Sequence, residues 1–281
     1  MSVAVGEFEG GDWDFARAGV VGPGGGAVIG YRDVGGVGLD LRVAGTSAVT
    51  VVVEFGGGEV VIDDAGGQRR VGGFVAGLPI EAMRIRSEGA ACVEVRLSPV
   101  RAYSVLGVAP GELGRRAVGV EELFGERVGR LREQLAEAGS WDERFALTNV
   151  FLGQGDTGWR GPDPEVIEVW ERIRASHGQV RIGEVAEEIG WSHKRLWGRF
   201  EGQIGLTPKR VAMLVRFRHA VDELLAGGAA AEVAVECGYS DQAHLCRDVA
   251  AFAGSTPRGV AANHLPSIAR QRYRAWGKFV Q

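Results

Sequence analysis

Short apolar runs separated by glycine-rich turns fill the first half of the chain. Residues 37–43 (VGLDLRV) and 92–97 (CVEVRL) alternate apolar and polar positions with a period of two, as strands with one buried face do. Of the 45 glycines, 32 fall in residues 1–160 and punctuate these runs. The pattern predicts an antiparallel β-barrel or β-sandwich. The candidate strands are Ala27–Tyr31, Val37–Val43, Val49–Phe55, Glu59–Asp63, Arg69–Val75, Ala82–Arg86 and Ala91–Leu97.

The apolar period changes from two to about 3.6 after Pro99. A Ser-Pro pair at 98–99 is a helix-entry signal, and residues 126–139 and 141–152 then place apolar side chains at helical spacing. Two amphipathic helices after a barrel are expected to pack on it, with a subunit contact as the alternative. Residues 153–164 are rich in glycine, aspartate and proline, which predicts a linker.

The predicted fold class is therefore α+β with two domains. Residues 1–155 form an antiparallel β-barrel or β-sandwich domain followed by two helices, and residues 165–265 form an all-α domain. The last stretch, residues 266–281, is a basic tail.

Two segments of the all-α domain resemble each other, residues 182–208 and 230–257. An internal repeat of this kind indicates the architecture more strongly than any single motif does. The matching positions are Glu184-Val185-Ala186 with Glu232-Val233-Ala234, Gly190 and Ser192 with Gly238 and Ser240, and Thr207-Pro208 with Thr256-Pro257.

Each unit follows the physical logic of a helix-turn-helix. A short helix is followed by a glycine that permits a tight turn, and then by a serine whose hydroxyl can cap the next helix. That second helix buries only a narrow stripe, Leu196 and Phe200 in the first unit, so its other faces point outward. Between the units, an apolar stripe predicts a helix of about 18 residues, roughly 27 Å long. Successive major-groove faces repeat about every 34 Å, so one chain could insert two helices into one side of a duplex.

Charge is distributed unevenly along the chain. The formal net charge is −4, yet residues 1–160 carry 16 basic and 22 acidic side chains whereas residues 191–281 carry 13 basic and 7 acidic ones. A net charge of +6 on the carboxy-terminal stretch suggests a polyanionic partner. No apolar run approaches the ~20 residues of a membrane span, and no secretory signal is visible, so we expect a cytoplasmic protein without a membrane partner.

Residues 1–160 contain no histidine, which excludes a histidine-ligated metal in the barrel. Asp63-Asp64 is expected to be a solvated turn, so we expect no metal site and no cofactor. One alternative is a cupin-type barrel enzyme with a helical protein-interaction tail, against which the missing histidines count. Another is a repair adaptor with a reactive cysteine, but no Pro-Cys or Cys-x-x-Cys context supports it.

Residues 165–261 resemble the AraC/XylS family of bacterial transcription regulators. The resemblance rests on the two units in order, on the connecting stretch LTPKRVAMLVRFRHAVDELL with Arg216, Ala220, Leu224 and Leu225, and on CGYSDQAHLCRDVAAFAGSTP. In that family the second helix of each unit enters a major groove. The family's base-facing positions fall on Lys194, Trp197 and Gly198 and on Gln242, Ala243, Cys246 and Arg247.

The resemblance implies a sequence-specific DNA-binding transcription regulator that is not an enzyme. It also implies a metal-free, cupin-like amino-terminal domain that binds a small-molecule effector or dimerises. The partners it implies are double-stranded DNA, the effector, a second copy of the chain and, for an activator, RNA polymerase. Two departures from the family's pattern are Gly198, which has no side chain where a reader is common, and Asp248, whose carboxylate beside Arg247 could repel phosphate.

Two sets of candidate site residues follow. The predicted DNA contacts are Ser192, His193, Lys194, Arg195, Trp197, Arg199, Lys209, Arg210, Gln242, Ala243, His244, Cys246 and Arg247. The predicted effector pocket comprises Tyr31, Arg32, Phe74, Arg84 and Arg86.

Overall fold

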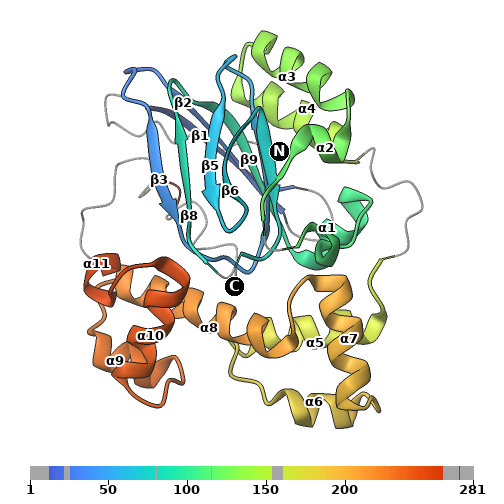
Figure 1. The fold of residues 1–281 in the computed structure, drawn as a ribbon, viewed down its shortest axis with the longest axis vertical. Coiled ribbons are helices and arrows are strands. Elements are labelled where there is room, and N and C mark those ends of the chain that lie inside the picture. Colours follow the sequence, from blue (N-terminus) through green and yellow to red (C-terminus); the bar gives the residue numbers. More distant parts are fainter. Residues whose placement is uncertain are drawn as a thin grey trace.

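The chain folds into a sheet-rich amino-terminal part stacked on a helical carboxy-terminal part (Figure 1). A computed structural model describes residues 13–21, 26–79, 81–114, 116–153, 161–261 and 272. The predicted α+β class with two domains is confirmed. Most of the predicted linker at 153–164 and, Arg272 apart, all of the predicted tail at 266–281 lie outside the described residues. Over the described ranges, no helix combines the length and hydrophobicity needed to cross a bilayer.

The amino-terminal part, called the sheet domain below, is a sandwich of two antiparallel sheets. A six-stranded sheet has the order β1-β2-β9-β4-β7-β10, and a four-stranded sheet has the order β3-β8-β5-β6. The strands are β1 (Trp13–Val21), β2 (Gly26–Asp33), β3 (Leu39–Val43), β4 (Val49–Glu54), β5 (Val60–Asp64), β6 (Gly67–Val71), β7 (Gly73–Ala76), β8 (Met83–Ser87), β9 (Ala91–Leu97) and β10 (Val118–Gly119).

Most of these strands lie where the sequence predicts them, but the expectation of one buried face at residues 92–97 is wrong, because β9 packs between two cores and is buried on both faces. The predicted strand Arg69–Val75 is wrong in one respect, because it divides into β6 and β7, which belong to different sheets. Gly73 stands at this break with φ +154°, in close contact with the backbone of β4. β1 and β10 were not predicted.

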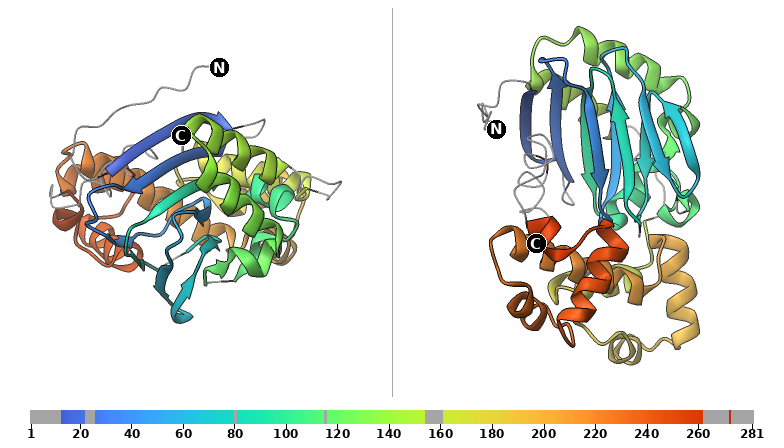
Figure 2. Two further views of the ribbon diagram at one scale, coloured as in Figure 1. Left: turned by 90° about the horizontal axis from the view of Figure 1, so that it is seen from above. Right: turned by 60° about the vertical axis from the view of Figure 1, so that its left-hand side comes forward.

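Strand β9 shows how the sandwich is layered. Cys92 faces the interior between the two sheets, whereas Val93 and Val95 face the helices on the outer side of the larger sheet. Glu94 is fully buried on the same strand. The strands run lengthwise toward the helical part, which covers one end of the sandwich (Figure 2).

Helices cover the outer face of the six-stranded sheet. Ser98 accepts a hydrogen bond from the Arg101 amide (3.1 Å) and caps the first of them, as the Ser-Pro pair predicts. The last of them, α4, contacts β1, β2 and β9, so the predicted packing of these helices on the sheet domain is confirmed. The elements are α1 (Pro99–Leu106), η1 (Pro110–Leu113), α2 (Val120–Phe124), α3 (Arg127–Glu137) and α4 (Trp141–Gly153).

The helical part, called the helical domain below, shares one apolar core. Helix α8 supplies the largest set of its buried side chains, and the other helices pack around it. The helices are α5 (Pro164–Ala175), α6 (Ile182–Glu188), α7 (His193–Ile204), α8 (Pro208–Leu225), α9 (Ala230–Glu236), α10 (Gln242–Ala253) and α11 (Pro257–Ala261).

The two domains touch at both ends of α8. At one end, α7 packs against η1 and α1, with Gly111 against the backbone of Gly202. At the other end, the Gly45 amide donates a hydrogen bond to the Phe252 carbonyl of α10 (2.9 Å). We call these two contacts the domain interface.

We predict that Gly111→Ala disturbs the contact between η1 and α7. The added Cβ would overlap the Gly202 carbonyl oxygen and lie 2.8 Å from that of Glu201, and neither backbone atom can turn aside. Overpacking of this kind costs about 1–3 kcal/mol, so the thermal unfolding midpoint should fall by several degrees. Gly129→Ala in α3 is the control, because its Cβ meets nothing within 4 Å. An unchanged midpoint for Gly111→Ala would show that this contact does not hold the domains together.

Candidate nucleic-acid interface

The first helix-turn-helix unit is built from α6 and α7. Gly190 adopts φ +69° at the turn, a conformation that costs glycine little. Ser192 then caps α7 by accepting a hydrogen bond from the Arg195 amide (3.3 Å), as the sequence predicts. Leu196 and Phe200 are fully buried, so the narrow apolar stripe predicted for this helix is confirmed.

The first turns of α7 carry the exposed side chains. His193, Lys194 and Arg195 are exposed, and Trp197 is half-buried. The imidazole of His193 stacks on the Trp197 indole (4.1 Å between centroids), and the Arg195 guanidinium lies over the Trp191 ring (4.3 Å). These ring contacts hold two of the side chains in place while leaving the Lys194 ammonium in solvent.

Arg199 has a different environment from the other basic residues of α7. Its guanidinium makes two hydrogen bonds to the Asp163 carboxylate, Nε to Oδ2 (2.7 Å) and Nη2 to Oδ1 (2.8 Å). Gln203 donates a third hydrogen bond to the same carboxylate (3.0 Å). Burial would raise the pKa of Asp163, but these hydrogen bonds outweigh it and lower the pKa. Arg199 therefore fastens α7 to the start of α5, a role that the sequence analysis missed.

The second unit, α9 and α10, repeats the architecture with a different cap. Asp241, and not the predicted Ser240, caps α10 by accepting a hydrogen bond from the His244 amide (2.6 Å). The Ser240 hydroxyl instead lies 3.2 Å from Nδ1 of His244. Gln242 and Arg247 are exposed on α10, and Cys246 is half-buried.

Asp248 does not face the predicted DNA surface, so the expected repulsion of phosphate is wrong. The residue is buried, and Oδ2 lies 3.6 Å from Nη2 of Arg216 on α8. The Arg216 guanidinium also lies over the Tyr239 ring (4.5 Å). Burial raises the pKa of Asp248. This group therefore joins α8 to the second unit from within.

Helix α8 separates the two reading helices, α7 and α10. It contains 18 residues, as predicted, and Figure 1 shows α7 and α10 at its opposite ends. A groove of about 450 Å³ between the units is bordered by His193, Trp197, Lys209, Arg216 and Gly238. All thirteen predicted DNA-contact residues are exposed or half-buried.

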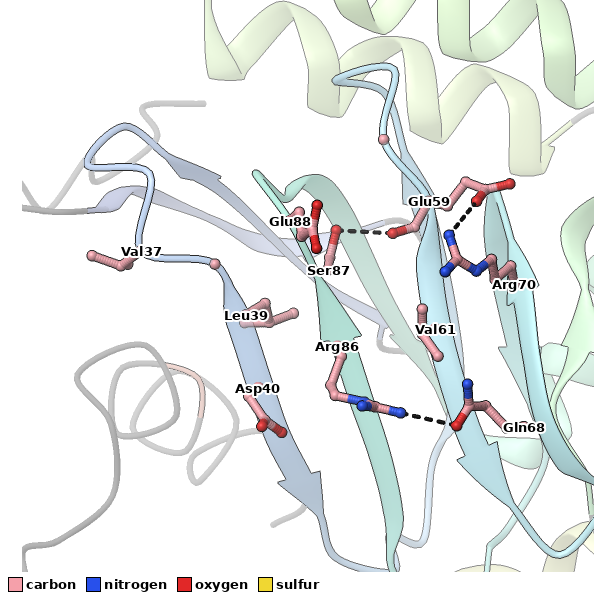
Figure 3. A pocket seen from close by; sticks show the side chains of 12 residues that line it. Val37, Leu39, Asp40, Glu59, Val61, Gln68, Arg70, Arg86, Ser87 and Glu88 are labelled. Atoms are coloured by element: carbon pink, nitrogen blue, oxygen red, sulfur yellow. Dashed lines mark hydrogen bonds and ion pairs between the residues drawn. The ribbon is translucent and has the colours of Figure 1, made fainter.

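The five predicted effector residues do not line one cavity. Tyr31 and Phe74 are buried between the sheets, whereas Arg32 pairs with Asp14 at the surface (3.0 Å). Arg84 and Arg86 lie on the outer face of the four-stranded sheet, where Arg84 pairs with Asp40 (2.6 Å) and Arg86 donates a hydrogen bond to Gln68 (3.0 Å). An open hollow of about 560 Å³ on this face is lined by Arg86 with Gln68 and by Glu59 with Arg70 (Figure 3).

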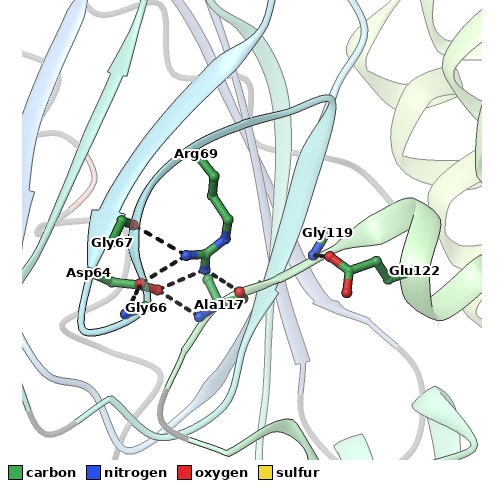
Figure 4. A network of polar contacts seen from close by, with 7 residues as sticks. All are labelled: Asp64, Gly66, Gly67, Arg69, Ala117, Gly119 and Glu122. Atoms are coloured by element: carbon green, nitrogen blue, oxygen red, sulfur yellow. Dashed lines mark hydrogen bonds and ion pairs between the residues drawn. The ribbon is translucent and has the colours of Figure 1, made fainter.

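Asp64 is not the solvated turn residue that the sequence suggested. Its carboxylate receives two hydrogen bonds from Arg69 (2.9 Å each) and one each from the amides of Gly66 and Ala117 (2.8 Å each) (Figure 4). Burial alone would raise the pKa of Asp64, but these hydrogen bonds hold it below the ordinary value. The carboxylate thus joins the β5–β6 hairpin to the segment before β10. In the part of the chain that the structure describes, no three His, Cys, Asp or Glu side chains gather as a metal site would need.

The Asp163–Arg199 pair predicts a coupled loss of stability. Arg199→Ala and Asp163→Ala should each lower the free energy of unfolding, and the double variant should lose less than the sum, with a coupling of about 1 kcal/mol or less because the pair is partly exposed. Denaturant unfolding of the four proteins measures this coupling. Additive losses would mean that the pair does not fasten α7 to α5.

Comparisons with known proteins found one family model and several solved structures. A family model described as "Helix-turn-helix domain" matches residues 185–263, and no curated protein matches the chain. Three solved structures are similar to it in fold. ToxT from Vibrio cholerae is 8% identical over 89% of this chain and 98% of its own (TM-score 0.49). The C-terminal domain of AraT, a response regulator from Geobacillus stearothermophilus, is 18% identical over 37% and 93% (TM-score 0.34). The AraC-like transcriptional activator CuxR is 14% identical over 74% and 82% (TM-score 0.35).

The matched residues begin in α6 and extend past α11, so they include both helix-turn-helix units and the α8 helix between them. This agreement between the family model and the two capped, outward-facing helices confirms the resemblance found in the sequence. The carboxy-terminal region of the chain is therefore a helix-turn-helix domain with two units joined by α8, as the sequence resemblance implies.

Proposed function

We propose that this protein regulates transcription by inserting the first turns of α7 and α10 into two successive major grooves of a DNA duplex. The observation that carries this proposal is the exposure of those turns on helices that share one rigid connection, α8. Helix α8 is about 27 Å long and has a reading helix at each end. This length is close to the ~34 Å distance over which the major groove repeats.

The first turns of α7 and α8 supply most of the phosphate affinity in this proposal. Lys194 and Arg195 on α7 and Lys209 and Arg210 at the start of α8 are exposed basic residues on neighbouring elements. Each cation that neutralises a phosphate releases condensed counterions, so this part of the affinity depends on salt. Arg199 contributes less, because Asp163 already occupies two of its donors.

Base recognition rests on side chains with directional or apolar contacts. The amide of Gln242 suits adenine, the guanidinium of Arg247 suits guanine, and Ala243, Cys246 and the Trp197 ring suit thymine methyl groups. The proposed DNA contacts are the thirteen residues of the sequence analysis: Ser192, His193, Lys194, Arg195, Trp197, Arg199, Lys209, Arg210, Gln242, Ala243, His244, Cys246 and Arg247.

The sheet domain is proposed to control DNA binding, not to catalyse a reaction. It contacts the last turns of both reading helices, so a change in its shape reaches both units. Its interior is filled by apolar side chains and by the buried pair of Glu94 and Arg96. We propose further that a small-molecule effector binds this domain and that the chain associates as a homodimer. The proposal also includes contact with RNA polymerase and a cytoplasmic location. The domain boundaries proposed are 1–155, 165–265 and 266–281.

Loss of the basic side chains of α7 should weaken DNA binding at every sequence. We expect Lys194→Ala with Arg195→Ala to reduce affinity at least tenfold and to lower the slope of log affinity against log salt by about two. The measurement is an electrophoretic shift on a duplex that the wild-type protein selects from a random library. Arg70→Ala, an exposed arginine of the sheet domain paired with Glu59, is the matched control and should bind normally. Wild-type affinity in the α7 variant would contradict the proposal.

Gln242→Ala should relax sequence choice more than it weakens binding. Removing one base-edge contact costs about 1–3 kcal/mol on the preferred sequence and almost nothing on others. Selection from the same library should therefore return a degenerate base at one position of the second half-site. An unchanged consensus would show that this side chain does not read DNA.

A further inference from the structure

A carboxylate lies inside the sheet domain and is paired with a residue far away in the sequence. Glu94 on β9 is fully buried, and its two oxygens serve different arginines. Oε1 accepts a hydrogen bond from Nε of Arg96 on the same strand (3.2 Å). Oε2 accepts two from Arg272, through Nε (2.8 Å) and Nη2 (2.5 Å). Arg272 is 178 residues further along the chain and lies beyond the helical domain.

The surroundings of Arg272 are those of a cation-binding site. The residue is 6% exposed, and its guanidinium carbon lies 5.8 Å from the centroid of the Tyr31 ring. A carboxylate combined with an aromatic face binds guanidinium groups through ionic hydrogen bonds and cation–π attraction. Burial alone would lower the pKa of Arg272, but Glu94 and Tyr31 raise it, so the charged form is favoured there.

The site also adjoins the helical domain. Arg96 and Arg272 border a cavity of about 30 Å³ whose other walls include Phe217, Arg218 and Val221 of α8. A cavity of this size holds about one water molecule, so Arg272 fits its surroundings closely. Any group that replaces Arg272 would therefore act on the wall formed by α8, the helix that separates the reading helices.

A buried ion pair is poor evidence that the pair exists for stability. Bringing a guanidinium out of water costs several kcal/mol, which its partner offsets only when the geometry is good, and apolar residues of similar volume often serve at least as well. Packing alone therefore does not explain why the Arg272 guanidinium also lies against Glu94, which Arg96 already contacts.

We propose that Glu94 and Tyr31 form a guanidinium-binding site, that Arg272 fills it as an internal ligand, and that a small guanidinium-bearing molecule can take its place. Because the site lies against α8, the exchange changes how the sheet domain holds the reading helices. Only this last step rests on the proposed function; binding of the cation does not.

Chemical rescue tests the site directly. In the full chain, Arg272→Ala removes the internal guanidinium and should lower the thermal unfolding midpoint. Methylguanidinium at low millimolar concentration should bind this variant saturably by calorimetry and raise its midpoint toward the wild-type value. Methylurea, which has nearly the same shape without the charge, should do neither. The double variant Arg272→Ala, Glu94→Gln should bind methylguanidinium at least tenfold more weakly.

Two outcomes would overturn the site: no saturable binding to Arg272→Ala, or equal binding to the double variant. If Arg272→Ala does not fold alone, the same comparison is made on its refolding yield. Recovery with methylguanidinium but not with methylurea then supports the site, and equal yields with the two additives overturn it.

A separate measurement tests the link to DNA. The affinity of Arg272→Ala for the selected duplex should change at least threefold when methylguanidinium is added, whereas the wild-type protein, whose site Arg272 fills, should respond less at the same concentration. If the cation binds and the affinity for DNA stays the same, the site stands and its control of the reading helices is overturned. If neither the variant nor the wild-type protein binds any duplex, the proposed function itself fails, independently of the calorimetry.

Discussion

Both helix-turn-helix units depend on one shared apolar surface, the buried face of α8. Neither α6 with α7 nor α9 with α10 has enough apolar side chains to form a core by itself. Leu196 and Phe200 of the first unit and Leu245 and Val249 of the second instead join a single cluster around α8. The same helix is thus both the core and the spacer. The separation of the two reading helices is fixed by the packing that makes each unit stable.

The domain interface divides each reading helix into two functional halves. The first turns, capped by Ser192 and Asp241, carry the side chains proposed to contact DNA. The last turns contact the sheet domain, α7 through Gly202 and α10 through the Phe252 carbonyl. These two contacts are made by different groups. At α7, backbone packs directly on backbone, whereas at α10 one hydrogen bond and the Arg42 side chain over Gly254 make the contact.

The elements that repeat a simple period could be predicted from the sequence, and those held by distant polar partners could not. Strands β3, β5 and β8 alternate because one face of each is buried, whereas β2, β4 and β9 are buried on both faces and are predicted from β-branched or apolar runs between glycine turns. Strand β1 follows neither pattern, because Asp14 is satisfied by Arg32 and by the Trp141 indole, 127 residues away from it. Likewise, the outward face of α7 follows from the spacing of Leu196 and Phe200. The salt bridge between Arg199 and Asp163 depends on how α5 packs against α7, and no local sequence pattern predicts that packing.

The charge asymmetry that first suggested a nucleic-acid partner is a poor measure of the charge that can meet DNA. Four arginines of residues 191–281 are already paired with carboxylates of the fold, Arg199 at the surface and the other three largely buried: Arg199, Arg216, Arg218 and Arg272 pair with Asp163, Asp248, Asp222 and Glu94. No carboxylate in the described ranges pairs with Lys194, Arg195, Lys209 or Arg210, and all four lie in the first turns of α7 and α8. The N-terminus of a helix also presents backbone amides that attract a phosphate, so the location of these four cations strengthens their attraction for the DNA backbone. The affinity for the DNA backbone therefore depends on the positions of a few cations, two on the first unit and two at the start of α8.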